Sequence, residues 1–118
     1  MRQAYAHDAV VIMSPDGDVR APGGAITVEL CGRIDHEPPC PVATHHTHAE
    51  RAGDQVRLRI LFATEPDRSG DVRLRIDRAL GAGTFVGPDG TMTTWQLRDS
   101  RPATVARAEQ DHATRLTT

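Results

Sequence analysis

Apolar and polar residues alternate along several short segments of this chain, and that alternation is the feature that most restricts its fold. The sequence VRLRI occurs at 56–60 and again at 72–76, and the segment 26–31 alternates in the same way. In an extended backbone, each segment places its apolar side chains on one side and its polar side chains on the other. This period of two is typical of antiparallel strands with one buried face. We therefore expect half-buried strands at these three places.

Further strands and turns are indicated between and around these segments. The segment 9–13 is almost wholly apolar, and 91–98 combines apolar and β-favouring residues. SPDGD at 14–18 and GPDGT at 87–91 carry proline before glycine, as tight turns do, and 64–71 is short enough to join the two VRLRI segments as a hairpin. The sequence predicts an all-β fold, a small antiparallel β-sandwich or meander of five to six strands.

The length of the chain is that of one domain, with a change of character near its C-terminus. A chain of 118 residues is close to the commonest domain size. We expect residues 1–98 to form a single β domain that carries a loop at 31–48. Residues 99–118 are predicted to be a tail, either a short helix that starts near Ser100 and Pro102 or a frayed end.

The overall charge excludes some classes of partner. The formal net charge is -2, so the chain as a whole has no attraction to nucleic acid or to anionic membranes, and neither is expected as a partner. All fourteen basic residues are arginine, and lysine and asparagine are both missing, a bias that a GC-rich bacterial genome explains. No signal peptide and no membrane-spanning apolar stretch is evident, which favours a cytoplasmic location.

The two VRLRI segments also suggest a surface for a partner. As the two arms of a hairpin they would bring Arg57, Arg59, Arg73 and Arg75 onto one face. Like charges opposite one another are unfavourable unless carboxylates lie between them or an anionic partner covers them. We expect a solvated face with acidic neighbours, or a docking surface for a partner protein.

Cysteine and histidine are concentrated in one stretch of eighteen residues. Both cysteines and four of the six histidines lie between 31 and 48. Thiolate and imidazole are the ligands that zinc prefers, and a closed zinc site needs four of them. We therefore predict a metal site there, with zinc as the first choice and copper, nickel or iron as alternatives. The candidate ligands are Cys31, His36, Cys40, His45, His46 and His48.

The sequence leaves the ligand set open. In an extended segment His46 and His48 point the same way and His45 points opposite. One set is therefore Cys31, Cys40, His36 and His45, and the other pairs the two cysteines with His46 and His48. Two unremarkable thiols in a polar loop, or a redox pair that closes to a disulfide, are the other interpretations. Cys40 with the proline after it also looks like the Cys-Pro dipeptide of haem-responsive proteins, in which the thiolate ligates iron.

A catalytic role finds little support in the sequence. The segment 46–50, HTHAE, resembles the H-x-H pair and glutamate of cupins, and 88–90, PDG, resembles part of their second motif. The glutamate follows too early, and no histidine or asparagine stands at the right place after Gly90, so the family is not assigned. In an open metal site Glu37 or Glu50 would be the candidate base. No other catalytic motif is present, and we assign no catalytic residues.

These observations give one leading hypothesis and two others. The first is a small cytosolic protein that holds one transition-metal ion in the Cys/His loop, with a structural or metal-handling role. The second is a non-catalytic accessory subunit that docks on a larger complex and uses the loop as a scaffold. The third, weaker, is a cupin-like or other metal-dependent enzyme.

Overall fold

The chain forms a mixed α/β structure with its strands and helices interspersed along the sequence. The structure, a computed structural model, describes residues 1–31 and 43–117. Its elements in chain order are β1 (Gln3–Ile12), α1 (Ala21–Cys31), β2 (Thr44–Ala52), β3 (Gln55–Thr64), η1 (Pro66–Arg68), α2 (Ser69–Ala82), β4 (Thr84–Val86), β5 (Met92–Thr94), β6 (Gln96–Ala103), η2 (Arg107–Glu109) and α3 (Gln110–Thr117).

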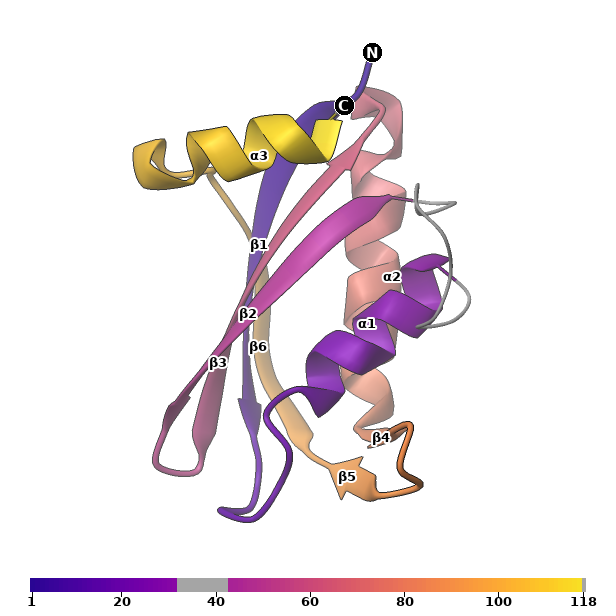
Figure 1. Ribbon diagram of the computed structural model, residues 1–118, viewed down its shortest axis with the longest axis vertical. Helices are drawn as coiled ribbons and strands as arrows, with labels where there is room; N and C mark the ends of the chain where they lie inside the picture. Colours follow the sequence, from indigo (N-terminus) through magenta and orange to yellow (C-terminus); the bar gives the residue numbers. More distant parts are fainter. Residues whose placement is uncertain (32–42, 118) are drawn as a thin grey trace.

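Four of the strands form one antiparallel sheet in the order β2-β3-β1-β6, and β4 and β5 form a separate hairpin. The helices α1 and α2 lie on one side of the sheet, and α3 crosses its other side near one end (Figure 1). Two β-α-β units are thus interleaved, with β1 and β3 at the centre. This is the split β-α-β arrangement of ferredoxin-like folds, a scaffold that does not by itself indicate a function.

The main core lies between the sheet and the helices α1 and α2. Strand β3 contributes alternate residues to it, from Val56 to Phe62, and α1 contributes Ile26 and Leu30. The opposite side of the sheet carries a smaller apolar patch of Ala6, Leu61 and Ala63, which is buried where α3 packs through Ala113. Since α3 covers only one end of that side, the rest of it, which includes Val10 and Arg57, is open to solvent.

The all-β prediction is wrong because the segment 72–76 lies in a helix. In α2, Val72 and Ile76 are buried, and Ala79 and Leu80 continue the same stripe at the spacing of helical turns. Leu74, which a strand would have buried with its neighbours, is 64% exposed. The apolar residues that follow the VRLRI segment therefore give it a helical period that the five residues alone do not show.

The segment 26–31 is also helical, against the predicted strand. Ile26 and Leu30 are one turn apart on α1 and are fully buried, whereas Val28 between them is 38% exposed. At the other end of the chain, Ser100 and Pro102 belong to β6, and the C-terminal helix starts only at Gln110. Within 1–31 and 43–117 we find no helix with the length and apolar character that crossing a membrane requires.

Candidate functional site

The candidate site is a pocket of about 420 Å³ between α1 and the edge strand β2. Pockets of this size accommodate small molecules. The helix side is formed by the N-terminal half of α1 and the residues just before it, and the strand side by the part of β2 that passes beneath. The lining residues are Val19, Arg20, Gly23, Thr27, His45, His46, Thr47 and Ala49.

The missing side chain of Gly23 makes the close approach of α1 to β2 possible. A Cβ atom at position 23 would lie 3.3 Å from Thr47 Cβ and 3.4 Å from Thr47 Cγ2, tighter than most real contacts. Glycine therefore lets the helix lie directly over Thr47. Thr47 Oγ1 is buried there and is the only buried side-chain polar atom in the described residues without a hydrogen-bond partner. A buried hydroxyl without a partner is uncommon, and it indicates room for a ligand group or a water.

Thr27 and His45 form a hydrogen-bonded pair on the wall of the pocket. His45 Nε2 lies 3.0 Å from Thr27 Oγ1, and Thr27 Oγ1 also lies 3.0 Å from the carbonyl oxygen of Gly23. His45 Nδ1 is 3.1 Å from the carbonyl oxygen of Ala43, so this nitrogen donates. Thr27 thus donates to Gly23 and shares a second hydrogen bond with His45, so both side chains are held in place on the wall of the pocket.

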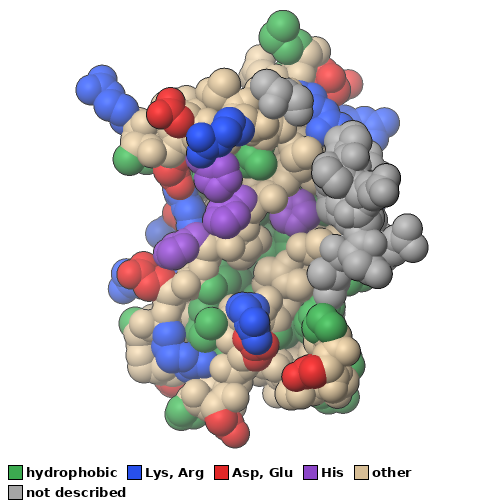
Figure 2. All heavy atoms as spheres, in the orientation of Figure 1, with side chains coloured by type: hydrophobic (Ala, Val, Ile, Leu, Met, Phe, Trp, Pro, Cys, Tyr) green, Lys and Arg blue, Asp and Glu red, His purple; other side chains and the backbone are tan. Residues whose placement is uncertain are grey.

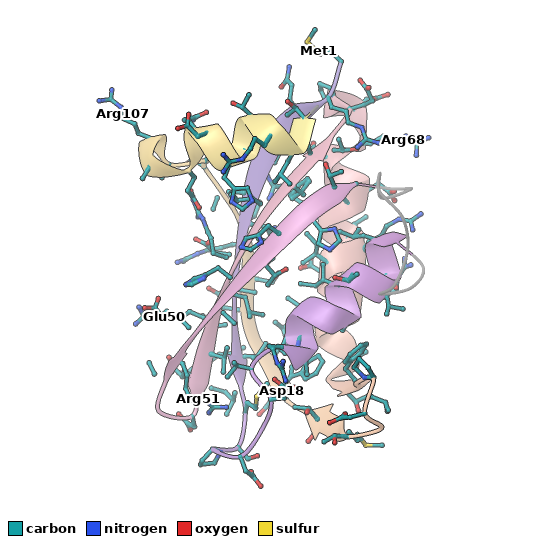
Figure 3. The ribbon with its side chains drawn as sticks, viewed as in Figure 1. Met1, Asp18, Glu50, Arg51, Arg68 and Arg107 are labelled. Carbon is teal, nitrogen blue, oxygen red and sulfur yellow. The ribbon has the colours of Figure 1, made fainter. Side chains whose placement is uncertain are left out.

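The pocket is lined by positive and neutral donors, and within 1–31 and 43–117 no carboxylate is among its lining residues. Arg20 stands at the start of α1, and the first turn of this eleven-residue helix contains no acidic residue to offset its positive end. The Arg20 guanidinium donates to both carboxylate oxygens of Asp18, at 3.1 and 3.2 Å. These hydrogen bonds hold the pKa of Asp18 below its usual range. Asp18 lies beside the N-terminal end of α1 (Figure 3), and the Arg20 side chain is 88% exposed, so this ion pair is a weak restraint.

A row of histidines follows the opposite side of β2. The register of β2 on β3 places His46 and His48 on the side that faces α3, whereas His45 faces α1, as the sequence predicted. The rings of His46 and His112 are 4.7 Å apart. Figure 2 shows histidine side chains gathered on this face of the molecule. Burial, followed by the nearby His112 and His48, lowers the pKa of His46, so the His46 ring favours its neutral form.

A second polar cluster lies between α2 and the sheet, and it contains a serine, a histidine and an aspartate. His7 Nε2 is 2.7 Å from Ser100 Oγ, and Ser100 Oγ donates to Asp77. His7 Nδ1 is 3.0 Å from Arg73 Nη1, a permanent donor, so Nδ1 accepts and Nε2 carries the proton. Because the serine proton points to the carboxylate, the histidine does not act as its base. Burial, and then Arg73, lowers the pKa of His7, which keeps the ring neutral.

The predicted metal centre is not supported by the structure. Among residues 1–31 and 43–117 there is no group of three or more His, Cys, Asp or Glu side chains arranged to hold a metal ion. His36 and Cys40 lie outside the described residues, and Cys31 ends a helix instead of a strand. His45 is separated from His46 and His48 by the two sides of β2. The metal-binding function inferred from the sequence is therefore withdrawn, together with the accessory-subunit role that used the same loop.

The cupin-like reading fails for a related reason. The residues of HTHAE at 46–50 lie on the edge strand β2, whereas Pro88 and Asp89 lie in the loop between β4 and β5. That loop lines a different pocket of about 370 Å³, together with Phe85 and the start of α1 and without any histidine among its lining residues. The two motifs thus do not combine into one site.

The four arginines of the VRLRI segments do not share a face. Arg59 points to the α3 side of the sheet, where it meets Asp8 at 2.9 Å and Glu109 at 2.7 Å. Arg73 lies on the other side of the sheet, where its Nη1 is 3.0 Å from His7 Nδ1. Arg75 pairs with Asp71 on the surface of α2, and Arg57 is exposed.

Sequence reasoning named His45 and His46 as metal ligands and missed the other residues of the pocket. Gly23 lies within the segment 21–24 and Arg20 precedes it, and the proline and two glycines of this segment are more typical of a loop than of a helix. Proline in the first turn of a helix was the signal that could have located the start of α1. Neither a protein-family model, nor a curated protein, nor a solved structure matches this chain.

Proposed function

We propose that this protein binds a small anionic molecule, of the class of carboxylic acids or phosphate esters, in the pocket between α1 and β2. The observation that carries the proposal is the composition of the pocket wall. Arg20, the imidazole of His45 and two threonine hydroxyls line about 420 Å³, and no carboxylate of residues 1–31 or 43–117 is among the lining groups. Such donors recognise oxyanions, and the positive end of α1 acts in the same direction.

The unpartnered hydroxyl of Thr47 supports the same proposal. Its oxygen is buried without a hydrogen bond, while Thr27 beside it is engaged with Gly23 and His45. A rotation of about 120° about χ1 brings a threonine hydroxyl to face a different neighbour. A bound oxyanion would give this hydroxyl the acceptor that it lacks. A cytoplasmic location, which the sequence favours, is part of this proposal because small phosphate esters and carboxylates are abundant metabolites there.

Binding is tested with inorganic phosphate, glycerol 3-phosphate and succinate as probes, and with glycerol as the neutral control. Amide chemical shifts locate the site, and calorimetry gives the affinity. We expect at least one anionic probe to shift the amides of Gly23, Thr27 and Thr47, and glycerol to shift none of them. Absence of binding by all three anions would contradict the proposal.

Two variants with matched controls test the pocket itself. Gly23→Ala inserts a Cβ against Thr47, and we expect it to weaken binding, whereas Gly81→Ala, on α2 with no atom within 4 Å of the new Cβ, should not. Arg20→Gln should weaken binding about tenfold or more, since hydrogen bonds to charged groups contribute about 1.5–3 kcal/mol. Arg68→Gln, on η1 outside the pocket, is its control. Unchanged affinity in both Gly23→Ala and Arg20→Gln would contradict the assignment of the site.

A further inference from the structure

The two edge strands of the sheet, β6 and β2, differ in how well they are protected against pairing with a further strand. At the β6 edge, the strand contains Pro102, and its register on β1 shifts at a bulge between Val10 and Val11. Proline, bulges and charged residues are the usual devices that block pairing at a sheet edge. At the β2 edge, the strand pairs with β3 without interruption over nine residues and contains no proline, and its only Asp, Glu, Lys or Arg residues are Glu50 and Arg51. Among the described residues nothing pairs with its outer side.

The hairpin between β2 and β3 determines which backbone groups of β2 face outward. Gly53, with φ of 68°, is the first of the two residues that connect Ala52 to Gln55, as in a type II′ turn. In a hairpin of this kind the residues beside the turn form a hydrogen-bonded pair, and such pairs recur at every second residue. The backbone N–H and C=O groups of even-numbered residues therefore point to β3. Those of His45, Thr47, Ala49 and Arg51 point to the open edge.

The polar side chains around Ala49 are arranged so that two copies of β2 complement each other. If two copies of β2 pair antiparallel about Ala49, His48 of each copy lies opposite Glu50 of the other. Both side chains are exposed, and in the described part of the chain neither has an ion-pair or hydrogen-bond partner. Glu50 projects outward from β2, away from α1 and α2 (Figure 3). An imidazole N–H can donate a hydrogen bond to a carboxylate across two strands, and polar cross-strand pairs contribute about 0.2–1 kcal/mol each.

The other face of the strand is compatible with the same register. Ala49 would lie opposite Ala49, and these two small side chains do not obstruct the pairing. Thr47 would lie opposite Arg51, whose guanidinium is held within its own copy by the carbonyl oxygens of Gly17 and Gly53, at 3.0 and 3.1 Å. In this register, no two residues of like charge lie opposite one another within the segment 46–52.

We infer that two copies of this chain associate through their β2 edges, antiparallel about Ala49, to form one continuous eight-stranded sheet with twofold symmetry. The self-complementary pattern favours a second copy over an unrelated strand, because the twofold operation itself generates both His48–Glu50 pairs. The inference does not depend on the proposed ligand, since the pairing uses outward backbone groups of β2, although Thr47 and Ala49 also line the pocket.

Sedimentation equilibrium and light scattering over a concentration series test the association. We expect the unmodified chain to dimerise, and Ala49→Pro to be monomeric at concentrations where the unmodified chain is dimeric. The proline removes an N–H that points outward and is not used in the β2–β3 ladder, so far-ultraviolet circular dichroism should stay unchanged. An unmodified chain that remains monomeric at all concentrations would overturn the inference.

An exchange of the two side chains shows whether the register is right, even if the proline variant fails to fold. His48→Glu places two carboxylates opposite one another and Glu50→His places two imidazoles there without a carboxylate, and each should weaken the dimer about tenfold, or ~1.4 kcal/mol. The double variant His48→Glu/Glu50→His restores the imidazole–carboxylate pairs and should recover most of the affinity. Dimerisation that none of these changes affects would place the interface elsewhere and overturn the inference.

Discussion

The same five residues, VRLRI, form a strand at 56–60 and a helical turn at 72–76. In β3 the Val, Leu and Ile all face the core, because successive side chains of a strand alternate between its two sides. In α2 only Val72 and Ile76 are buried, since a helix returns to the same side every three to four residues. The pentapeptide fits either structure equally well. The residues around it therefore decide which one forms.

The flanking residues differ in ways that physical reasoning accounts for. The first copy follows the Gly53 turn and runs into Leu61, Phe62 and Ala63, all buried. The second copy follows a 3-10 turn with Pro66 at its start, and it precedes Ala79 and Leu80, which continue its apolar stripe at helical spacing. α2 then ends at Gly83, whose φ of 73° is a common way to terminate a helix.

The largest expected difference between the two copies of VRLRI concerns the central leucine, which we would replace by alanine in each copy. Leu58 is 2% exposed and Leu74 is 64% exposed. Leu58→Ala should lower the free energy of unfolding by about 2–5 kcal/mol, since it leaves a cavity in the core. Leu74→Ala should change it by less than about 0.5 kcal/mol. Urea denaturation of both variants measures the difference, and equal losses would contradict the helical assignment of the second copy.

The second arginine of each copy gives a smaller contrast. Arg59 joins β3 to β1 and to η2 through Asp8 and Glu109, and its hydrogen bonds lower the pKa of Glu109. Arg75 makes a single ion pair with Asp71 one turn away on the same helix. We expect Arg59→Gln to cost about 1–2 kcal/mol of stability and Arg75→Gln about 0.3–0.5 kcal/mol. Thermal unfolding in high salt should reduce the Arg75 effect more than the Arg59 effect.

The first arginine of the second copy affects the response to acid. Burial, and then the charge of Arg73, lowers the pKa of His7 from about 6.5. Below that pH, His7 is protonated in the unfolded chain more readily than in the folded chain. The free energy of unfolding therefore falls as the pH falls. In Arg73→Met this loss between about pH 7 and 5 should be shallower. His46, whose pKa is also lowered, contributes alike to both chains, so the difference in slope reports on Arg73. Identical slopes would contradict this account.

Sequence reasoning succeeded where the local pattern and the surroundings agree. It placed strands at 9–13 and 56–60, and it predicted opposite orientations for His45 and His46. It failed at 26–31 and 72–76, because short alternating runs also fit a helix with one exposed apolar residue. The pocket could not be predicted, since its two walls, Gly23 and Thr47, are brought together by the packing of α1 on β2. The metal hypothesis relied on histidines and cysteines that are close in the sequence, but His45 lies on one side of β2 and His46 and His48 lie on the other.

The last prediction strengthens the helical context of the second copy without touching the five residues. Gly70 lies in the first turn of α2, and a Cβ there would meet no atom within 4 Å. Gly70→Ala should raise the free energy of unfolding by about 0.5 kcal/mol, because alanine favours the helix and restricts the unfolded chain. The opposite result is expected for Gly24→Ala on α1, since its Cβ would lie 2.6 Å from the Phe85 ring. Urea denaturation of the pair separates helix propensity from packing. If both variants were stabilised equally, the close contact between α1 and the β4–β5 hairpin would not exist in solution.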